Sequence, residues 1–505
     1  MVVERTGNTL SLKRLGIDTH EEPVVYMRAD CHVCRSEGFS AHSRVLITVG
    51  ARSIIATLNV VRDGFVLPTE AGLSEAAWQL LAAVPGDVAT MAHPRPVDSL
   101  GAVRAKVFGR AFSEQQLTAI LQDMASGRYT DIELSSYLTA CAAVGMSLDE
   151  VVWQTRGMVD VGSRLAWDRP VIADKHCVGG LPGNRTTPIV VAIVAAAGVW
   201  IPKTSSRAIT SPAGTADTME TLAPVDLDLP TMRRVIEREG GCVIWGGAIH
   251  LSPVDDLLVR VERALDVDSD AQLVSSVLSK KVAAGATHVV IDLPVGPTAK
   301  MRTPQAAYDV ARLLERVGDA VGLIVRPVLT DGTQPIGRGI GPALEARDVV
   351  AVTRGDLDAP ADLRARAVLL AGEVLELAGA CPAGHGATQA AAILADGRAW
   401  RKLQAICEAQ GGMRTPPVSA QRFEVTAPVA GTVLDIDNRR LSRAAKLAGA
   451  PADPAAGIDL HVRLGDRVAA GEPLFTLHAE SPGEVGYVRD YLAAHADVIT
   501  VGVPR

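Results

Sequence analysis

The chain has 505 residues, of which 48% are hydrophobic and 4% aromatic, and its formal net charge at pH 7 is −7. This length predicts several domains, and the acidic balance argues against nucleic acid as the main partner, because binding a phosphate backbone needs a basic face. Seven cysteines, an odd number, argue against a disulfide framework. The first residues form no apolar signal segment, and the longest apolar run, 189–201, is too short to span a bilayer. We therefore expect a soluble, cytoplasmic protein without membrane contact.

Residues 1–95 predict a small β-rich domain. Three runs in this segment, 24–26, 44–49 and 53–61, are rich in residues that favour strands. Gly50 and Gly64 follow the second and third runs, where turns are expected.

The segment Cys31-His32-Val33-Cys34 resembles a metal or redox site. A zinc site needs a second pair of ligands, and none follows at a suitable spacing in the sequence. We therefore expect Cys31 and Cys34 to be buried or incidental thiols. The chain is expected to need no metal and no other cofactor.

Residues 96–168 predict a small all-α domain. Ser113 is a start signal for a helix, and further helices are predicted to begin near Thr130 and Ser147. The first of these helices carries an apolar stripe at helical spacing, formed by Leu117, Ile120, Leu121 and Met124. This stripe is interpreted as core.

Residues 169–415 predict an α/β domain, because strand and helix patterns alternate there. A parallel sheet binds its ligands at the carboxyl ends of its strands. Four residues are expected just after strands and therefore close to such a site: Lys175, Ser205, Gly246 and Lys300. The predicted strands are 170–173, 199–201, 242–245, 287–292 and 323–330. The predicted helices are 216–222, 229–239, 256–265, 271–284, 361–378 and 388–406.

The first of two Gly-rich loops begins Asp174-Lys175-His176-Cys177-Val178-Gly179-Gly180. Thr187 followed by Pro188 is a helix start signal, with a capping hydroxyl and then a proline. A strand, a Gly-rich loop and a helix N-terminus together form an anion site, because free N–H groups and the helix dipole point at it. Lys175 adds a full positive charge.

A second loop repeats this arrangement. It reads Lys203-Thr204-Ser205-Ser206-Arg207-Ala208-Ile209-Thr210-Ser211 and closes with Gly214-Thr215-Ala216-Asp217. Hydroxyl groups and a guanidinium suit phosphate oxygens. Either loop alone could be an ordinary turn. Two such loops, each next to a strand and each with a cation, predict a phosphate site.

Residues 420–505 predict a C-terminal α+β domain. The segments 427–433 and 465–474 resemble the hammerhead of lipoyl- or biotin-carrier domains. Such a carrier needs a lysine at the tip of a hairpin. No Met-Lys-Met lies between the two segments, and Lys446 sits in a helical-looking stretch. We therefore expect the hammerhead fold without a prosthetic group.

The two loops also carry a resemblance to a known family. Asp-Lys-His-x-x-Gly-Gly at 174–180, with Ser-x-Arg at 205–207 and Gly-Thr-x-Asp-x-x-Glu at 214–220, resembles the thymidine phosphorylase family over nearly the whole chain. The extended form of both loops is more similar to the branch that contains AMP phosphorylases. The resemblance implies α/β class with additional domains: an all-α domain for dimerisation and closure, the α/β domain, an N-terminal β-rich domain and the C-terminal domain.

The resemblance also implies roles for individual residues. The phosphate-binding positions are Lys175, Thr187, Ser205 and Thr215. The nucleotide-binding positions are Gly180, Ser206, Arg207, Ala208, Ile209, Thr210, Ser211, Thr215, Ser276, Lys280 and Lys300. Asp268 matches a proton donor, and His176 matches a histidine that polarises the base. Cys177 stands where many members have serine, so one phosphate contact is weaker, because a thiol is a poor donor.

Two of these roles have simpler alternatives. His176 could be structural, as most lone histidines are. Asp268 could be only the N-cap of the helix predicted at 271–284.

The implied reaction is phosphorolysis of an N-glycosidic bond, with inorganic phosphate and a nucleoside monophosphate giving free base and ribose 1,5-bisphosphate. Pyrimidine-specific members place an arginine seven residues before the aspartate, where this chain has Val261, flanked by Arg260 and Arg263. The alternatives are a thymidine phosphorylase and a non-catalytic nucleotide-binding regulator. Anthranilate phosphoribosyltransferase shares the two-domain plan, but it lacks the Asp-Lys-His motif and the C-terminal domain. A homodimer or higher homo-oligomer is expected.

Overall fold

The computed structural model describes residues 7–62, 64–208, 211–249, 251–265, 267 and 269–503. Three residues with predicted roles, Ile209, Thr210 and Asp268, lie outside these described residues. The chain divides into two compact units. One consists of Met1–Ala102 with Gln122–Leu134, and the other of Val103–Leu121 with Ser135–Arg505.

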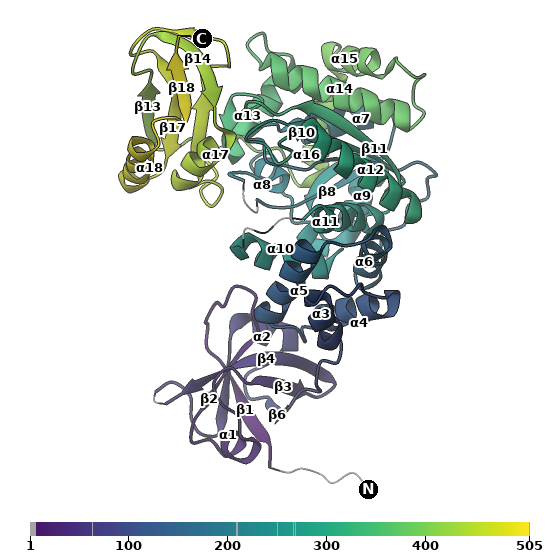
Figure 1. The fold of residues 1–505 in the computed structure, drawn as a ribbon, viewed down its shortest axis with the longest axis vertical. Helices are drawn as coiled ribbons and strands as arrows, with labels where there is room; N and C mark the ends of the chain where they lie inside the picture. The colour runs from purple at the N-terminus through teal and green to yellow at the C-terminus, as the bar shows by residue number, and fades with distance from the viewer. Residues whose placement is uncertain are drawn as a thin grey trace. The chain divides into compact units, whose positions relative to one another are not determined.

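The first unit contains a closed six-stranded barrel with the strand order β1-β5-β2-β4-β3-β6 (Figure 1). The pairs β1–β5 and β2–β4 are parallel and the others antiparallel. Along β3 buried and half-buried residues alternate, which directs Val45 and Ile47 into the barrel core. The three predicted strands correspond to β2, β3 and β4. The elements are β1 (Thr9–Arg14), β2 (Val24–Arg28), α1 (His32–Glu37), β3 (Arg44–Val49), β4 (Arg52–Val61), β5 (Glu70–Leu73), α2 (Glu75–Leu81) and β6 (Val88–Ala92).

Cys31 and Cys34 lie in the barrel core. Cys31 caps helix α1, because its Sγ accepts the N–H of Cys34 at 3.1 Å. Among the residues that the structure describes, no group of three or more His, Cys, Asp or Glu side chains could hold a metal ion.

Four helices follow the barrel: α3 (Leu100–Val107), α4 (Glu114–Ala125), α5 (Asp131–Val144) and α6 (Leu148–Asp160). Helix α6 begins with a capping box between Ser147 and Glu150. The Glu150 carboxylate also accepts Lys106 Nζ at 2.7 Å, and both side chains are buried. This buried pair fixes α6 against α3.

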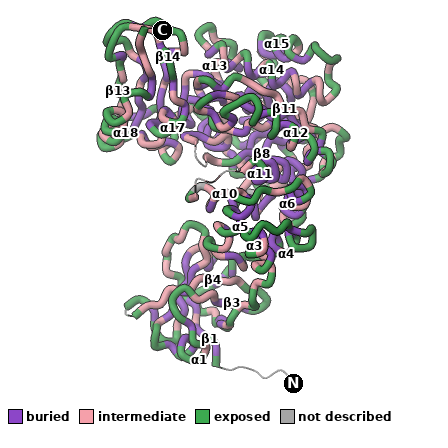
Figure 2. The backbone as a smooth tube through the Cα atoms, in the orientation of Figure 1, coloured by how far each residue is buried: buried purple, intermediate pink, exposed green. Residues whose placement is uncertain are grey.

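The α/β part is built on parallel strands. β11, β10 and β7 form one sheet, β8 and β9 form another, and a bridge between Ile172 and Trp200 connects them. Helices cover both faces, since Val290 of β10 packs in one apolar cluster while Val289 and Ile291 pack in a second. Figure 2 shows α11 largely buried. The strands are β7 (Ala173–Cys177), β8 (Ile201–Ser205), β9 (Gly241–Trp245), β10 (His288–Val295) and β11 (Ile324–Asp331). The helices are α7 (Thr186–Ala196), α8 (Thr215–Glu220), α9 (Leu229–Glu239), α10 (Pro253–Leu265), α11 (Asp270–Ala283), α12 (Pro304–Ala320), α13 (Pro342–Arg354), α14 (Ala361–Leu377), α15 (Gly386–Ala395) and α16 (Arg398–Gln410).

Two predicted strands were placed too early. The run at 170–173 shares only its last residue with β7, and the run at 199–201 shares only its last residue with β8. Lys175 therefore lies inside β7, paired in register with Val290, and Ser205 is the last residue of β8. The apolar-run rule failed because a buried parallel strand can carry charged residues when other buried groups neutralise them. Gly246 does follow β9 directly, and Lys300 follows the end of β10.

Three helix predictions also need correction. Helix α7 begins at Thr186 with Arg185 as N-cap and without a side-chain cap bond, so Thr187 is not the cap. Helix α11 is capped by Ser269, whose hydroxyl accepts the N–H of Gln272 at 3.2 Å, so Asp268 is not the N-cap. The helix predicted at 388–406 is two helices, α15 and α16, separated at Gly397, which has a φ of 76°.

The C-terminal domain consists of two small sheets with α17 and α18 (Figure 1). Strand β12 belongs to the α/β segment of the chain but joins the larger sheet of the C-terminal domain, because Ile340 pairs with Ile458 of β15. Lys446 lies on α17 rather than at a hairpin tip. The elements are β12 (Gly339–Ile340), β13 (Gln421–Thr426), β14 (Gly431–Ile436), α17 (Asn438–Leu447), β15 (Gly457–Leu460), β16 (Arg467–Val468), β17 (Pro473–Ala479), α18 (Pro482–Ala494) and β18 (Ile499–Gly502). In the described ranges no helix is both long and apolar enough to cross a membrane.

Candidate active site

Lys175 lies inside strand β7, which leads into the first loop, and is fully buried. Its Nζ donates to Thr186 Oγ1 at 2.7 Å and lies 3.4 Å from Thr187 Oγ1, and both threonines occupy the first turn of α7. Burial lowers the pKa of Lys175 below its ordinary value. The Lys175 ammonium group is thus hydrogen-bonded to hydroxyl groups at the N-terminus of α7 and not to a carboxylate.

A buried ion cluster lies behind this lysine. Asp174 Oδ1 is 3.2 Å from Lys203 Nζ, and Asp174 Oδ2 is 2.9 Å from Lys281 Nζ. Burial alone would raise the pKa of Asp174, but the two ammonium groups outweigh it and hold this pKa below its usual value. Burial, which Asp174 only partly offsets, lowers the pKa of Lys203 well below its ordinary value, so a net positive charge of this cluster does not follow from counting its two lysines.

His176 follows Lys175 on β7 and is placed to remain neutral. Burial, together with Lys281 and Lys203, lowers the pKa of His176 well below its ordinary value. A neutral imidazole can donate or accept a hydrogen bond, whereas an imidazolium would add charge. His176 can therefore polarise a ligand near pH 7 but is not an acid at that pH.

Cys177 ends β7 in a polar chain. Asn184 Nδ2 lies 3.3 Å from Cys177 Sγ and 3.2 Å from Asp292 Oδ2, and Thr330 Oγ1 donates to Asp292 Oδ1 at 2.6 Å. Burial and the Asp292 carboxylate raise the pKa of Cys177 to about 12, so it is a thiol. Asn184 has a φ of 53°, an unusual conformation that this network holds.

Two predicted nucleotide-binding residues, Gly180 and Lys300, are brought together by the fold. A Cβ at Gly180 would lie 2.6 Å from the backbone nitrogen of Lys300. Gly180 also has a φ of 78°. A larger residue at Gly180 would therefore force this loop away from Lys300.

The second loop is organised by Asp217 of α8. Its Oδ2 accepts the N–H of Ala208 at 2.6 Å and that of Gly214 at 2.8 Å. Arg207 forms a two-point ion pair with Glu220 and lies 5.0 Å from the Trp245 ring centroid. The charge of Arg207 is therefore neutralised within the loop.

Other hydroxyls of this loop differ in their partners. Ser205 Oγ is buried and makes no hydrogen bond to any residue that the structure describes. Ser211 Oγ donates to the carbonyl of Ala213 at 2.9 Å. Among the described residues of this loop, Ser205 combines burial with an unused hydroxyl, which suits it to a ligand oxygen.

Arg185 connects the two loops. Its guanidinium donates to Thr215 Oγ1 at 2.7 Å, to the carbonyl of Ala213 at 2.9 Å and to Glu345 Oε2 at 2.6 Å. Sequence reasoning assigned no role to Arg185, Glu345 or Lys281. Arg185 lies in the chain between Gly180 and Thr187, whereas Glu345 and Lys281 are distant in sequence and are brought to the site by the tertiary fold.

The chain is similar to known families and proteins over most of its length. Residues 169–400 match "Glycosyl transferase family, a/b domain", residues 101–162 match its helical bundle domain, and residues 432–497 match "Pyrimidine nucleoside phosphorylase C-terminal domain". A protein of Polaromonas named "Putative thymidine phosphorylase" is 61% identical over 98% of this chain and 97% of its own. A second such protein, from Acidovorax, is 59% identical over 99% and 97%.

The chain belongs to the thymidine phosphorylase family. The predicted resemblance is confirmed, and this member of the family is an enzyme of the pentosyltransferase class. The phosphorylase family implies phosphate and a nucleoside as substrates. A solved anthranilate phosphoribosyltransferase from Thermus thermophilus is 20% identical over 61% of the chain with a TM-score of 0.49, a similarity too low to inform on activity.

Helices α10 and α11 carry the remaining positions predicted for this phosphorylase family member. Lys280 forms an ion pair with buried Asp255. Burial of Lys280 would lower its pKa, but the nearby Asp255 carboxylate outweighs burial and raises it. Ser276 is half-buried and its carbonyl oxygen accepts Ser279 Oγ at 3.4 Å. Val261 is buried on α10 with 6% of its surface exposed. The side chain of Arg263 is outside the described part of the chain.

Proposed function

We propose that the chain catalyses the reversible phosphorolysis of a nucleoside 5′-monophosphate, giving the free base and ribose 1,5-bisphosphate. The observation that carries the choice of substrate is Val261. Pyrimidine-specific relatives are expected to have an arginine at this position, and valine cannot donate to a pyrimidine carbonyl. A pocket that lacks a required polar contact discriminates strongly against the substrate that needs it.

The proposed reaction breaks one bond to C1′ of the ribose and forms another. A phosphate oxygen attacks C1′ of the ribose, the C1′–N bond breaks, and the electron pair leaves with the base through an oxocarbenium-like transition state. Lys175, Thr187 and Ser205 are proposed to hold the phosphate beside C1′. Their support is the buried ammonium on the threonine hydroxyls and the unused hydroxyl of Ser205.

The departing base needs a proton or a hydrogen bond. Because burial and nearby lysines depress the pKa of His176, we propose that it polarises the base as a neutral imidazole. Asp268 is proposed as the proton donor. This role would require its pKa to be raised above the ordinary value of an aspartate.

The remaining positions are proposed to bind the nucleotide. Gly180 and Lys300 are supported by their close approach. Thr215 is proposed to act beside Arg185, which already donates to its hydroxyl. The other proposed contacts are Ser206, Arg207, Ala208, Ile209, Thr210, Ser211, Ser276 and Lys280.

A thymidine phosphorylase is the second candidate, and two observations favour it. The similar proteins from Polaromonas and Acidovorax carry that name. In addition, Glu220 neutralises Arg207, which leaves less positive charge for a 5′-phosphate in the second loop.

The test is a comparison of kcat/KM for AMP, CMP and UMP with that for thymidine and uridine at one phosphate concentration, with reactions lacking phosphate as the control. We expect at least one monophosphate to exceed both nucleosides. A higher value for thymidine than for every monophosphate would refute the nucleotide proposal and leave a thymidine phosphorylase. Binding without any phosphate-dependent base release would indicate a regulator instead.

We also propose a homodimer that buries apolar side chains of α3 and α5. Phe108 at the end of α3 has 85% of its surface exposed, and Val107 and Val144 are also exposed. Light scattering on the purified protein should give twice the mass of the chain. A monomer at micromolar concentration would contradict this proposal.

A further inference from the structure

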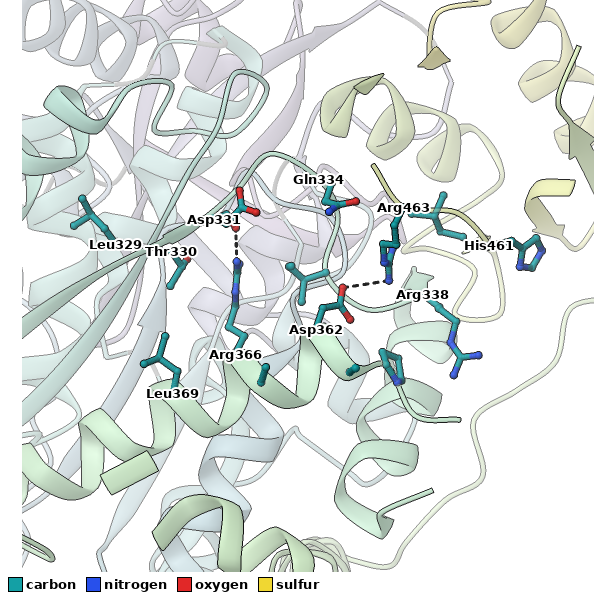
Figure 3. Close-up of a pocket in the computed structure, with 15 residues that line it drawn as sticks. Leu329, Thr330, Asp331, Gln334, Arg338, Asp362, Arg366, Leu369, His461 and Arg463 are labelled. Atoms are coloured by element: carbon teal, nitrogen blue, oxygen red, sulfur yellow. Dashed lines mark hydrogen bonds and ion pairs between the residues drawn. The ribbon is translucent and has the colours of Figure 1, made fainter. Parts of the chain in front are cut away.

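A cleft of about 810 Å³ lies where the C-terminal domain meets the α/β sheet. Its walls come from the end of β11, the loop before β12, the start of α14 and the segment after β15, as Figure 3 shows. The cleft contains none of the residues predicted to bind phosphate or nucleotide. One lining residue, Thr330, donates to Asp292 of the polar chain at Cys177, so the cleft lies next to the candidate active site and is lined by residues of its own.

Three arginines line this cleft: Arg338, Arg366 and Arg463 (Figure 3). Arg366 donates to the carbonyl of Asp331, and Arg338 donates to the carbonyl of Asp358. Neither makes an ion pair with any side chain in the described ranges. Arg366 is nonetheless 92% buried, since only 8% of its surface is exposed. Arginines are rarely buried this far without a carboxylate, because the uncompensated charge is costly to desolvate.

Arg463 completes the group from the C-terminal domain. Its NH2 donates to the carbonyl of Gly337 at 2.6 Å and lies 3.2 Å from Asp362 Oδ2. The NH1 atoms of Arg463 and Arg366 have no acceptor within the described part of the chain. Buried N–H groups without acceptors are uncommon in folded proteins and often indicate a missing ligand, ion or water.

The rest of the cleft indicates the kind of ligand. Leu329, Leu369 and Leu460 provide an apolar surface, and Gln334 and Thr330 provide hydrogen-bonding groups. The volume accommodates a molecule of the size of a sugar phosphate or a nucleotide. An oxyanion would supply the acceptors and the negative charge that the arginines lack, since guanidinium groups bind phosphate and carboxylate through paired hydrogen bonds.

We propose that this cleft is a binding site for a small organic oxyanion, held by Arg338, Arg366 and Arg463 and separate from the nucleoside site. The ligand contacts the α/β domain through Arg338 and Arg366 and the C-terminal domain through Arg463. Binding therefore links the two domains.

The experiment is a calorimetric titration of ribose 5-phosphate, citrate and inorganic phosphate into the wild-type protein and three variants. Arg463→Gln and Arg338→Gln each remove one proposed contact. Arg467→Gln is the matched control, because Arg467 is an exposed arginine of the same domain outside the cleft. Arg366 is left intact, because its charge also contributes, after burial, to the lowered pKa of Lys175.

We expect at least one organic anion to bind, with an affinity at least about tenfold lower in Arg463→Gln and Arg338→Gln and unchanged in Arg467→Gln. Nucleoside phosphorolysis without added anion should be the same in Arg463→Gln as in the wild type. Binding of ribose 5-phosphate alone would assign a phosphate ester, and binding of citrate alone would assign a polycarboxylate.

Three results would overturn the proposal. The first is no binding of any probe up to about 10 mM, and the second is an equal affinity of all variants. The third is loss of phosphorolysis together with anion binding in Arg463→Gln, which would place the anion in the nucleoside site. If Arg463→Gln does not fold, as judged by thermal unfolding, Arg338→Gln decides between these outcomes.

Discussion

The two Gly-rich loops share one plan but differ in how their cations are neutralised. In the first, β7 leads to α7, and Lys175 donates to the hydroxyls of Thr186 and Thr187. In the second, β8 leads to α8, and Arg207 is held by the carboxylates of Asp217 and Glu220. The same pattern of glycines, hydroxyls and cations thus gives two different sites. The lysine of the first loop has no carboxylate as a hydrogen-bond partner, whereas the arginine of the second loop is neutralised by carboxylates.

This difference suggests a division of tasks. An anion is attracted by charge that the protein has not already compensated, so the first loop and Ser205 should hold the phosphate. The second loop, whose charges are internally paired, should orient the rest of the substrate through N–H and hydroxyl groups.

The largest effect is expected for Lys175→Ala. Removing the buried ammonium group of Lys175 should lower kcat/KM about 100-fold, which corresponds to about 2–3 kcal/mol of transition-state stabilisation, and should raise KM for phosphate. Lys402→Ala is the control, because Lys402 lies on α16 and forms an ion pair with Glu239 of α9. If phosphate KM and kcat/KM stay unchanged and only the melting temperature falls, Lys175 merely supports the two threonines.

The pH dependence of phosphate binding should identify the same lysine. Because burial lowers the pKa of Lys175, its ammonium is present at low pH and is lost as the pH rises through a value below the ordinary lysine pKa. KM for phosphate should therefore rise on the alkaline side, approaching about tenfold per pH unit beyond that pKa. Measurement of initial rates from pH 6 to pH 10 checks this, and a flat profile would count against a charged Lys175 at the site.

A smaller effect is expected for Ser205→Ala. The hydroxyl has no partner among the described residues, so its removal should leave stability nearly unchanged. A lost hydrogen bond to a charged phosphate should lower kcat/KM about tenfold. Ser211→Ala is the matched control, because its hydroxyl is already used by the Ala213 carbonyl. Equal activity of both variants would show that Ser205 does not contact the phosphate.

The smallest effect is expected for Glu220→Gln. The substitution frees Arg207 from its carboxylate partner and should strengthen anion binding in the second loop by about threefold. The effect is small because the side chains of Arg207 and Glu220 are 37% and 40% exposed. Inhibition constants for a nucleoside monophosphate measure it, and a decrease in affinity would mean that the ion pair itself shapes the site.

The sequence predicted whole elements better than the strands that carry the site. Helix α9 and strand β3 have the predicted limits, 229–239 and 44–49. Strands β7 and β8 were misplaced because their charged residues break the apolar pattern. Those charges are tolerated only because Asp174 meets Lys203 and Lys281 across neighbouring elements. Such neutralisation depends on tertiary register, which local patterns do not contain.

The candidate site shows the same limit. The motif identified Lys175 and Ser205, but it could not show that Lys175 donates to two threonine hydroxyls or that the buried hydroxyl of Ser205 has no partner among the described residues. It also could not show that Arg207 is neutralised, since Glu220 is 13 residues away and is brought close by α8. Bond partners of this kind are decided by side-chain packing.

The most direct test of the division between the loops is a calorimetric titration of inorganic phosphate into Lys175→Ala and Arg207→Ala. Each variant removes one cation from one loop. We predict that Lys175→Ala loses phosphate binding at the nucleoside site and that Arg207→Ala binds phosphate within about twofold of the wild type. The reverse pattern, with phosphate binding retained in Lys175→Ala and lost in Arg207→Ala, would contradict the account.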